Sequence, residues 1–137
     1  MNTRNFFVIG IILSVLFMAG CIQQNNVPSV TQLSVDKAYV FPAEQVRIGY
    51  YIQNPLSAAF EGSVKYTYDR TCFSGTDSTS VKVPSSVSVA YSADFKLSDS
   101  YSFSESCYGP KQITLVLTDS TGKPLYAATA DFTVAKH

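Results

Sequence analysis

Residues 45–53 read Gln-Val-Arg-Ile-Gly-Tyr-Tyr-Ile-Gln, and apolar side chains occupy every second position of this stretch. The apolar set is Val46, Ile48, Tyr50 and Ile52. Successive side chains of a β-strand point to opposite faces, so these four would share one face, whereas a helix would scatter them around its circumference. The stretch therefore predicts a strand with one buried and one solvated face.

The same period of two recurs on both sides of this stretch. The side chains expected to face the core are Phe60, Val64, Tyr66 and Tyr68 in residues 60–69; Val87, Val89, Tyr91, Ala93, Phe95 and Leu97 in residues 87–97; Ile113, Leu115 and Leu117 in residues 113–118; and Tyr126, Ala128, Ala130, Phe132 and Val134 in residues 126–134. Two weaker strands are predicted at 31–35 and 78–83. Turn residues separate the runs, and residues 119–124 predict a hairpin.

Strands that hide one face and expose the other pack as antiparallel sheets around a shared core. We therefore expect an all-β fold, namely an antiparallel immunoglobulin-like β-sandwich of about seven strands, preceded by a hydrophobic signal helix. An antiparallel barrel is the main alternative. The chain has no tryptophan, and no Tyr-x-Cys corner is evident, so an antibody-type domain is not indicated.

Residues 41–54, Phe-Pro-Ala-Glu-Gln-Val-Arg-Ile-Gly-Tyr-Tyr-Ile-Gln-Asn, are followed by Glu-Gly-Ser-Val at 61–64. This pattern resembles the opening of CARDB-type extracellular sandwich domains. Ala43 stands where that family usually has glycine, and the glycine that usually follows Asn54 is missing. The resemblance implies the sandwich fold and no particular ligand.

The first twenty-one residues have the layout of an export signal. Arg4 precedes an apolar run at 6–17, and Met18-Ala19-Gly20 leads to Cys21. The fifteen residues 6–20 would form a helix of about 22 Å, which is short for a hydrocarbon core of about 30 Å. An uncleaved short anchor, or an ordinary signal followed by a chance cysteine, are the alternatives to a lipoprotein signal.

Ala19-Gly20-Cys21 resembles the lipobox of prokaryotic lipoproteins, with Met18 where leucine is usual. The resemblance implies that Cys21 carries the lipid (a diacylglycerol and a further acyl chain such as palmitate) and that the chain is extracytoplasmic and anchored to the cell membrane. The expected domains are a signal peptide at 1–20, a lipid-anchored linker at 21–28 and the sandwich at 29–135. Membrane lipid is then the first expected partner.

The charge of the chain is nearly balanced, with ten basic and ten acidic side chains. Removing Arg4 with the leader leaves nine basic against ten acidic groups, a net charge of about −1. No basic patch is present that would hold a phosphate backbone, so nucleic acid is not expected as a partner.

Cys72 and Cys107 remain as an even pair once Cys21 is lipidated. In an exported domain we expect them to form a disulfide. The alternatives are a zinc site or a catalytic thiol. Both usually need histidine ligands or partners, and the only histidine is His137.

Motifs of catalysis are missing from the sequence: it contains no Gly-x-Ser-x-Gly, no phosphate-binding glycine loop and no His-Glu-x-x-His. The acids considered for glycosidase-type chemistry are Asp69, Asp77, Asp94, Asp99 and Glu105, and we expect them to be solvated surface groups. A calcium site from Asp77, Asp99 and Glu105 is not favoured by their spacing. No enzyme activity, cofactor or metal is expected.

The loop 98–110 alternates serine with aromatic residues beside Cys107. Tyrosine and serine are favoured in recognition loops because rigid rings give contact area at low entropy cost. The candidate partner-contact residues are Phe73, Tyr101, Phe103 and Tyr108; alternatively, these rings cover the open end of the core. We therefore expect a non-catalytic binding module for an envelope protein or glycan. The alternative is a structural or accessory subunit of an envelope assembly without a ligand pocket.

Overall fold

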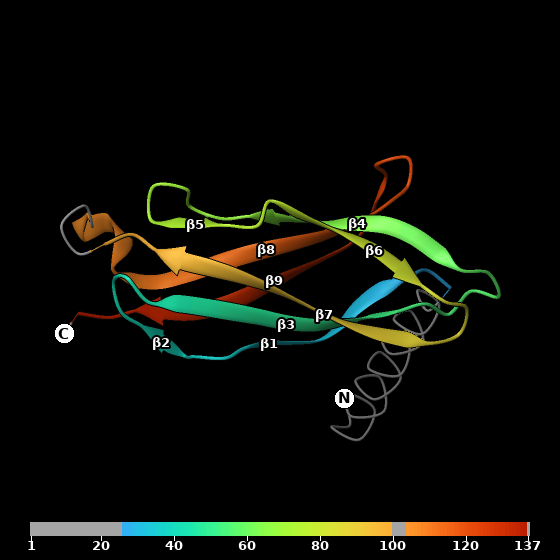
Figure 1. Ribbon diagram of the computed structural model, residues 1–137, viewed down its shortest axis with the longest axis horizontal. Coiled ribbons are helices and arrows are strands. Elements are labelled where there is room, and N and C mark those ends of the chain that lie inside the picture. Colours follow the sequence, from blue (N-terminus) through green and yellow to red (C-terminus); the bar gives the residue numbers. More distant parts are fainter. Residues whose placement is uncertain (1–25, 100–103, 137) are drawn as a thin grey trace, which may run out of the picture.

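The computed structural model describes residues 26–99 and 104–136. In this part of the chain nine strands form two packed sheets, and one 3₁₀ helix precedes the eighth strand (Figure 1). The elements are β1 (Ser29–Val35), β2 (Tyr39–Val40), β3 (Gln45–Gln53), β4 (Phe60–Thr67), β5 (Phe73–Gly75), β6 (Ser78–Val83), β7 (Ser88–Leu97), η1 (Glu105–Cys107), β8 (Gly109–Asp119) and β9 (Pro124–Val134). The predicted signal helix and Cys21 lie outside the described residues. Within them, no helix is long and apolar enough to cross a membrane.

One sheet has the strand order β1-β3-β7-β5 and the other β2-β9-β8-β4-β6. All paired strands are antiparallel except β2, which runs parallel to β9. The predicted all-β sandwich is confirmed. The alternative barrel is excluded, because the strands form two separate sheets with open edges. The strand number exceeds seven because β2 and β5 have two and three residues, too few for an alternating pattern to register.

Most predicted strands lie where the alternation placed them. β3 spans the predicted residues, and its apolar side chains are buried. Residues 119–124 form the hairpin between β8 and β9. Two of the inward-facing predictions are wrong. Val87 lies in the loop before β7 and is exposed, and Tyr126 is exposed beside a register shift of the β8–β9 ladder.

The sheet edges are short, irregular or capped. A bulge interrupts β1 between Thr31 and Ser34, and β2 and β5 are short. At the edge of β6, the Tyr91 hydroxyl accepts a hydrogen bond from the Lys82 backbone N–H and donates one to the Lys82 carbonyl, both at 3.1 Å. Free strand edges invite pairing with another chain, and these features oppose it.

A chain of aromatic rings crosses the core from one sheet to the other. Tyr91 stacks on Tyr50, which meets Tyr66 edge-on, and Phe95 lies between Tyr66 and Tyr68. The Tyr50 and Tyr66 hydroxyl oxygens are 2.5 Å apart, and Tyr66 is also hydrogen-bonded to Thr79 at 3.1 Å. Burial raises the pKa of Tyr50 far above its ordinary value, so this phenol stays neutral and needs a partner.

We predict that Tyr66→Phe destabilises the fold by about 1–3 kcal/mol, because the Tyr50 hydroxyl loses its partner inside the core. Tyr50→Phe should cost less, because Tyr66 keeps Thr79. The double variant should cost less than the sum of the two single changes, since no hydroxyl is then left without a partner. Free energies of unfolding from urea titration test this, and strictly additive losses would contradict the assigned coupling.

Candidate interaction surfaces

Cys72 and Cys107 form a disulfide, as predicted. Their Cα atoms are 5.6 Å apart, they are 35 residues apart in the chain, and both side chains are buried. Closing a loop of this length stabilises a fold by about 3–4 kcal/mol in the chain-entropy model. The bridge ties the β4–β5 loop to η1, and we call this end of the sandwich, where β3 begins and β7 ends, the disulfide end.

Hydrogen bonds from backbone and side-chain groups hold the loops of the disulfide end together. The Ser98 N–H and hydroxyl both donate to the Cys72 carbonyl, at 3.0 and 3.3 Å. The Asp69 carboxylate accepts from the backbone and hydroxyl of Thr71, and these hydrogen bonds lower the pKa of Asp69. Lys111 donates to the Ser106 carbonyl at 2.8 Å and so fastens η1 to β8. The loops therefore leave the sandwich from fixed points.

The predicted contact residues have different surroundings in the structure. Phe73 is 3% exposed and its ring meets that of Phe132 edge-on at 5.6 Å. It pairs with Leu97 in the sheet and shares its core-facing side, so the expectation that Phe73 contacts a partner is wrong. Tyr108 is half-buried, with the Lys136 ammonium 4.9 Å from its ring centroid. Tyr101 and Phe103 lie outside the described residues.

An open depression of about 790 Å³ lies beside these loops, and the sequence pattern had not indicated it. Its lining includes Tyr39 of β2, Lys111 of β8, Asp131 of β9 and Asp69. Tyr39 is 66% exposed, which makes it the most exposed large apolar side chain among the described residues. Tyr39 lies on a strand of only two residues, which is too short for an alternating pattern to predict which way its side chain points.

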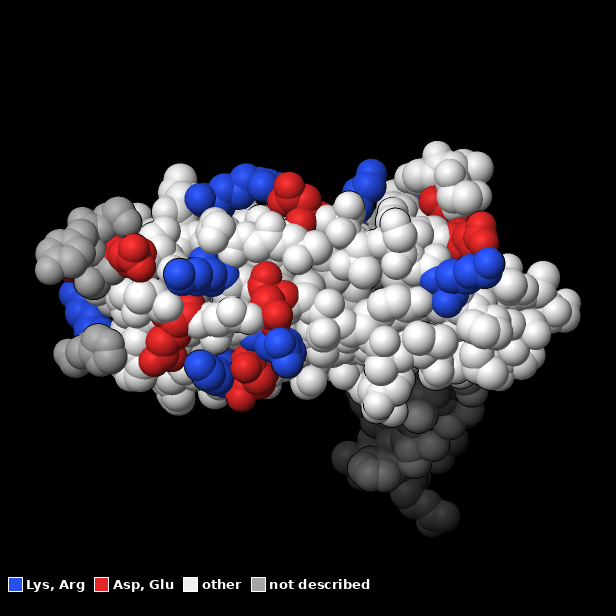
Figure 2. Space-filling view, in the orientation of Figure 1, with Lys and Arg blue, Asp and Glu red and all other residues white. Residues whose placement is uncertain are grey.

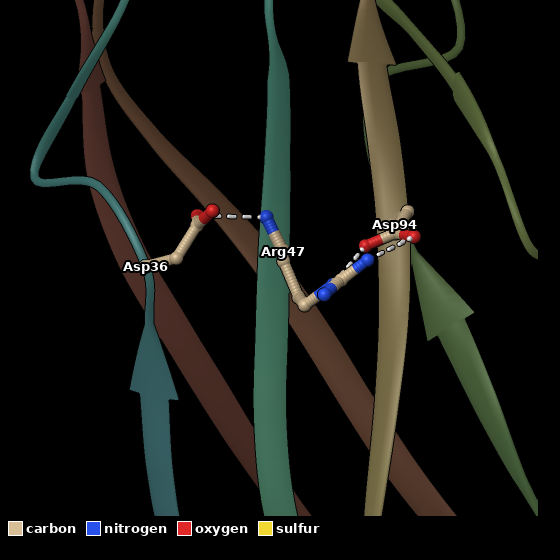
Figure 3. Close-up of polar contacts among 3 residues, drawn as sticks. All are labelled: Asp36, Arg47 and Asp94. Atoms are coloured by element: carbon tan, nitrogen blue, oxygen red, sulfur yellow. Dashed lines mark hydrogen bonds and ion pairs between the residues drawn. The ribbon is translucent and has the colours of Figure 1, made fainter.

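Charged groups form a cross-strand network on the outer face of the four-stranded sheet (Figure 3). The Arg47 guanidinium makes two hydrogen bonds to the Asp94 carboxylate, at 2.7 and 3.1 Å, and the Arg47 backbone N–H donates to Asp36 at 2.8 Å. These hydrogen bonds between the two side chains lower the pKa of Asp94 and raise the pKa of Arg47. The network fixes three neighbouring segments in register without forming a pocket.

The opposite end of the sandwich has a different chemistry. Here β1 begins, β3 ends and β7 begins, since Ser29, Gln53 and Ser88 lie in one row. Residues 26–30, 54–59 and 84–87 contain no charged side chain. In Figure 2 most of the charged side chains on the visible face lie over the half that carries the disulfide end in Figure 1, and a smaller group of both signs lies on the other half.

Three aliphatic side chains are exposed at this end: Val27, Leu56 and Val87, at 39%, 37% and 43%. The segments of Leu56 and Val87 are joined by backbone hydrogen bonds, from Asn54 to Val87 at 3.0 Å and from Ser86 to Leu56 at 3.2 Å, and Val27 lies two residues before Ser29, the partner of Gln53. We call residues 26–30, 54–59 and 84–87 the apex.

Asn54 is the buried residue that shapes the apex. Its amide nitrogen lies 2.9 Å from the Ala58 carbonyl and 3.1 Å from those of Val83 and Pro84. Its side-chain oxygen accepts from the Leu56 N–H at 3.0 Å. In the sequence this asparagine only ends the 41–54 pattern, and the structure adds its contact with residues about thirty positions away.

The acids considered for catalysis are mostly engaged in separate contacts. Asp77 pairs with Arg70 at 2.8 Å, Asp94 with Arg47, and Glu105 with Lys136 at 2.7 Å. In residues 26–99 and 104–136, no three His, Cys, Asp or Glu side chains lie in a group that could hold a metal ion.

Comparison with known proteins identifies relatives in fold. No protein-family model matches the chain, and no protein of curated function matches it. A FixG-related protein from Vibrio parahaemolyticus is similar over 80% of this chain and 97% of its own, with a TM-score of 0.58 and 12% identity. CaCohA2 from Clostridium acetobutylicum is similar over 81% of this chain and 92% of its own, with a TM-score of 0.53 and 16% identity.

A third similar structure is the DNA-bound alkylpurine DNA glycosylase AlkC from Pseudomonas fluorescens, with a TM-score of 0.57 and 11% identity. The match covers 80% of this chain and 30% of AlkC. At such low identity these likenesses show the sandwich fold alone, and the different proteins that share it leave the function to be argued from surface chemistry.

We predict that the Asp94 carboxyl titrates below its ordinary value of 3.8 and that Arg47→Gln returns it toward that value. Because the folded-state pKa is lowered, the pair stabilises the fold above the unfolded-state pKa, and this contribution is lost as pH falls through the folded-state value. Carbon-13 NMR titration of the carboxyl group measures both proteins. An Asp94 pKa unchanged by Arg47→Gln would contradict the assigned cause.

Proposed function

We propose that this chain is a lipid-anchored, extracytoplasmic protein without catalytic activity, whose disulfide end binds another protein of the cell envelope. The lipobox-like Ala19-Gly20-Cys21 supports the anchor. The observation that carries the proposal is that the two ends of the sandwich differ: the chain enters where the apex segments have no charged side chain, and Tyr39, Tyr108 and most of the ion pairs lie at the opposite end.

The disulfide end has the properties of a recognition surface. The bridge and the Ser98 hydrogen bonds hold the bases of the loops, so little conformational entropy is lost there on binding. Tyr39 offers an exposed ring beside the depression, and Lys111 and Asp131 supply one charge of each sign. An aromatic anchor surrounded by polar groups is typical of a protein interface.

A protein partner is favoured over a glycan by the openness and mixed charge of this surface. A crystal structure in which CaCohA2 is in complex with a CaDoc0917 variant belongs to the same group of similar folds, with a TM-score of 0.51, so a sandwich of this kind is compatible with a protein complex. The capped and irregular edges of β1 and β6 oppose recognition by strand addition. We therefore expect the partner to bind through the loops of the disulfide end and the depression beside Tyr39.

The anchor is tested by the mass of the mature protein. We predict that the leader 1–20 is removed, and that the N-terminal peptide begins at Cys21 and carries a diacylglycerol. Cys21→Ser should abolish incorporation of a labelled fatty acid, even if the uncleaved leader keeps the chain at the membrane. An N-terminal peptide that begins at Met1 without lipid in the wild type would contradict the proposal.

Binding is tested by purification of the full chain from detergent-solubilised membranes. We predict a stoichiometric protein companion that is lost with Tyr39→Ser or Tyr101→Ala while the melting temperature is unchanged. Tyr126→Ser is the matched control, because this tyrosine is also exposed but lies at the far end of β9 from the depression. Retention of the companion in all variants would favour a structural role elsewhere, and retention by polysaccharide alone would favour a glycan.

A further inference from the structure

The apex exposes apolar side chains to solvent. Leu56 and Val87 lie on segments joined by the hydrogen bonds between residues 54 and 87 and between residues 86 and 56, and Val27 precedes Ser29, which pairs with Gln53 at the same end. Tyr51 of β3, in register with Thr31 and Ala90, adds an exposed ring on the adjoining sheet face. Four of the six exposed large apolar side chains of the described residues therefore lie on this end or on the sheet face next to it, and clustering of exposed apolar groups is typical of an interaction surface.

Charge is excluded from the same region over a wide area. Residues 26–35, 48–60 and 83–93 have no charged side chain, and these segments include the apex and the adjoining half of the four-stranded sheet. The charged network of Asp36, Arg47 and Asp94 lies in the other half. Two charges of each sign lie near this end on the other sheet: Glu61 and Lys82, which pair at 3.3 Å where β4 begins and β6 ends, and Asp119 and Lys123 of the β8–β9 hairpin. Bringing this end to a lipid interface therefore desolvates few charges, and desolvation of charges is the main cost of such contact.

The length and position of the preceding chain limit what can reach the apex. Only residues 22–26 separate Cys21 from Val27, so the two are six residue spacings apart, at most about 22 Å when fully extended. If Cys21 is lipidated as proposed above, the apex stays within this distance of the bilayer. A partner protein would have to fit into a gap of that size, whereas the lipid surface is already there.

The apex is held in shape before any contact. Asn54 is 1% exposed, and its side chain joins the 54–59 segment to residues 83 and 84. Leu56 is therefore presented on a turn that is hydrogen-bonded from within. A preorganised apolar tip loses little conformational entropy when it enters the interface.

We propose that the apex docks onto the lipid bilayer, with Val27, Leu56 and Val87 in its interfacial region, so that the sandwich stands on the membrane with the disulfide end facing away. This inference rests on the proposed lipid anchor at Cys21. It adds an orientation that a flexible tether alone would not impose. Strands of about 3.3 Å per residue place the disulfide end roughly 30 Å further from the bilayer than the apex.

The natural chain contains no tryptophan, so a single introduced tryptophan reports its own depth. The full lipidated protein would be reconstituted in phosphatidylcholine vesicles with or without bromine on the acyl chains. Leu56→Trp should show a blue-shifted emission and about twofold quenching by the brominated lipid, since interfacial side chains enter the region between headgroups and acyl chains. Val87→Trp provides a second reporter should the first variant fold poorly.

The matched control is Tyr39→Trp, at an exposed site of the disulfide end. Its emission should be unaffected by bromine. Protein that sediments with the vesicles but shows no quenching at residues 56 and 87, or equal quenching at residue 39, would overturn the docked orientation while leaving the anchor intact. Wild-type protein that carries no lipid and stays in the supernatant would contradict both the anchor and the docking that rests on it.

Discussion

The contact between Tyr50 and Tyr66 at the centre of the core is the interaction on which the rest of the sandwich depends. Tyr50 belongs to β3 and Tyr66 to β4, so their hydroxyl pair joins the two sheets where both are buried. Rings on either side extend this contact through Tyr91 and Phe95. Because a buried hydroxyl without a partner is costly, the pair favours one alignment of the sheets over others that would bury the same apolar area. The strand ends, and the loops that leave them, take their positions from that alignment.

Two local devices then shape the two ends. At one end a disulfide joins Cys72 to Cys107 and holds the loops that follow β4 and β7. At the other end the Asn54 side chain makes hydrogen bonds to backbone carbonyls from two loops. Both devices are buried, and both connect segments about thirty residues apart in the chain. They keep the loop bases in place without regular secondary structure, which allows the exposed parts of the loops to differ in chemistry.

This difference between the ends is the main functional feature of the molecule. The apex and the adjoining half of the four-stranded sheet have no charged side chain and carry exposed aliphatic groups, and the other end carries the exposed Tyr39, the depression beside it and most of the charged pairs. Proteins of the same fold include a FixG-related protein and a part of a DNA glycosylase, so the fold does not decide the function. The proposals made for this chain rest on its lipobox-like cysteine and on where its surface chemistry lies.

The all-β class, the position of β3, the β8–β9 hairpin and the pairing of Cys72 with Cys107 could be predicted from the sequence, because alternation, turn residues and an even cysteine count are local or compositional properties. Assembly of the two sheets was needed to show that Phe73 belongs to the core, that Val87 and Tyr39 are exposed, and that Arg47 meets Asp94 across 47 positions of the chain. Short strands and strand ends have too few residues to show a period, so cross-strand register and the packing of the opposite sheet determine which way their side chains point. The separation of charged from uncharged ends has the same origin, since it depends on which distant segments the two sheets bring together.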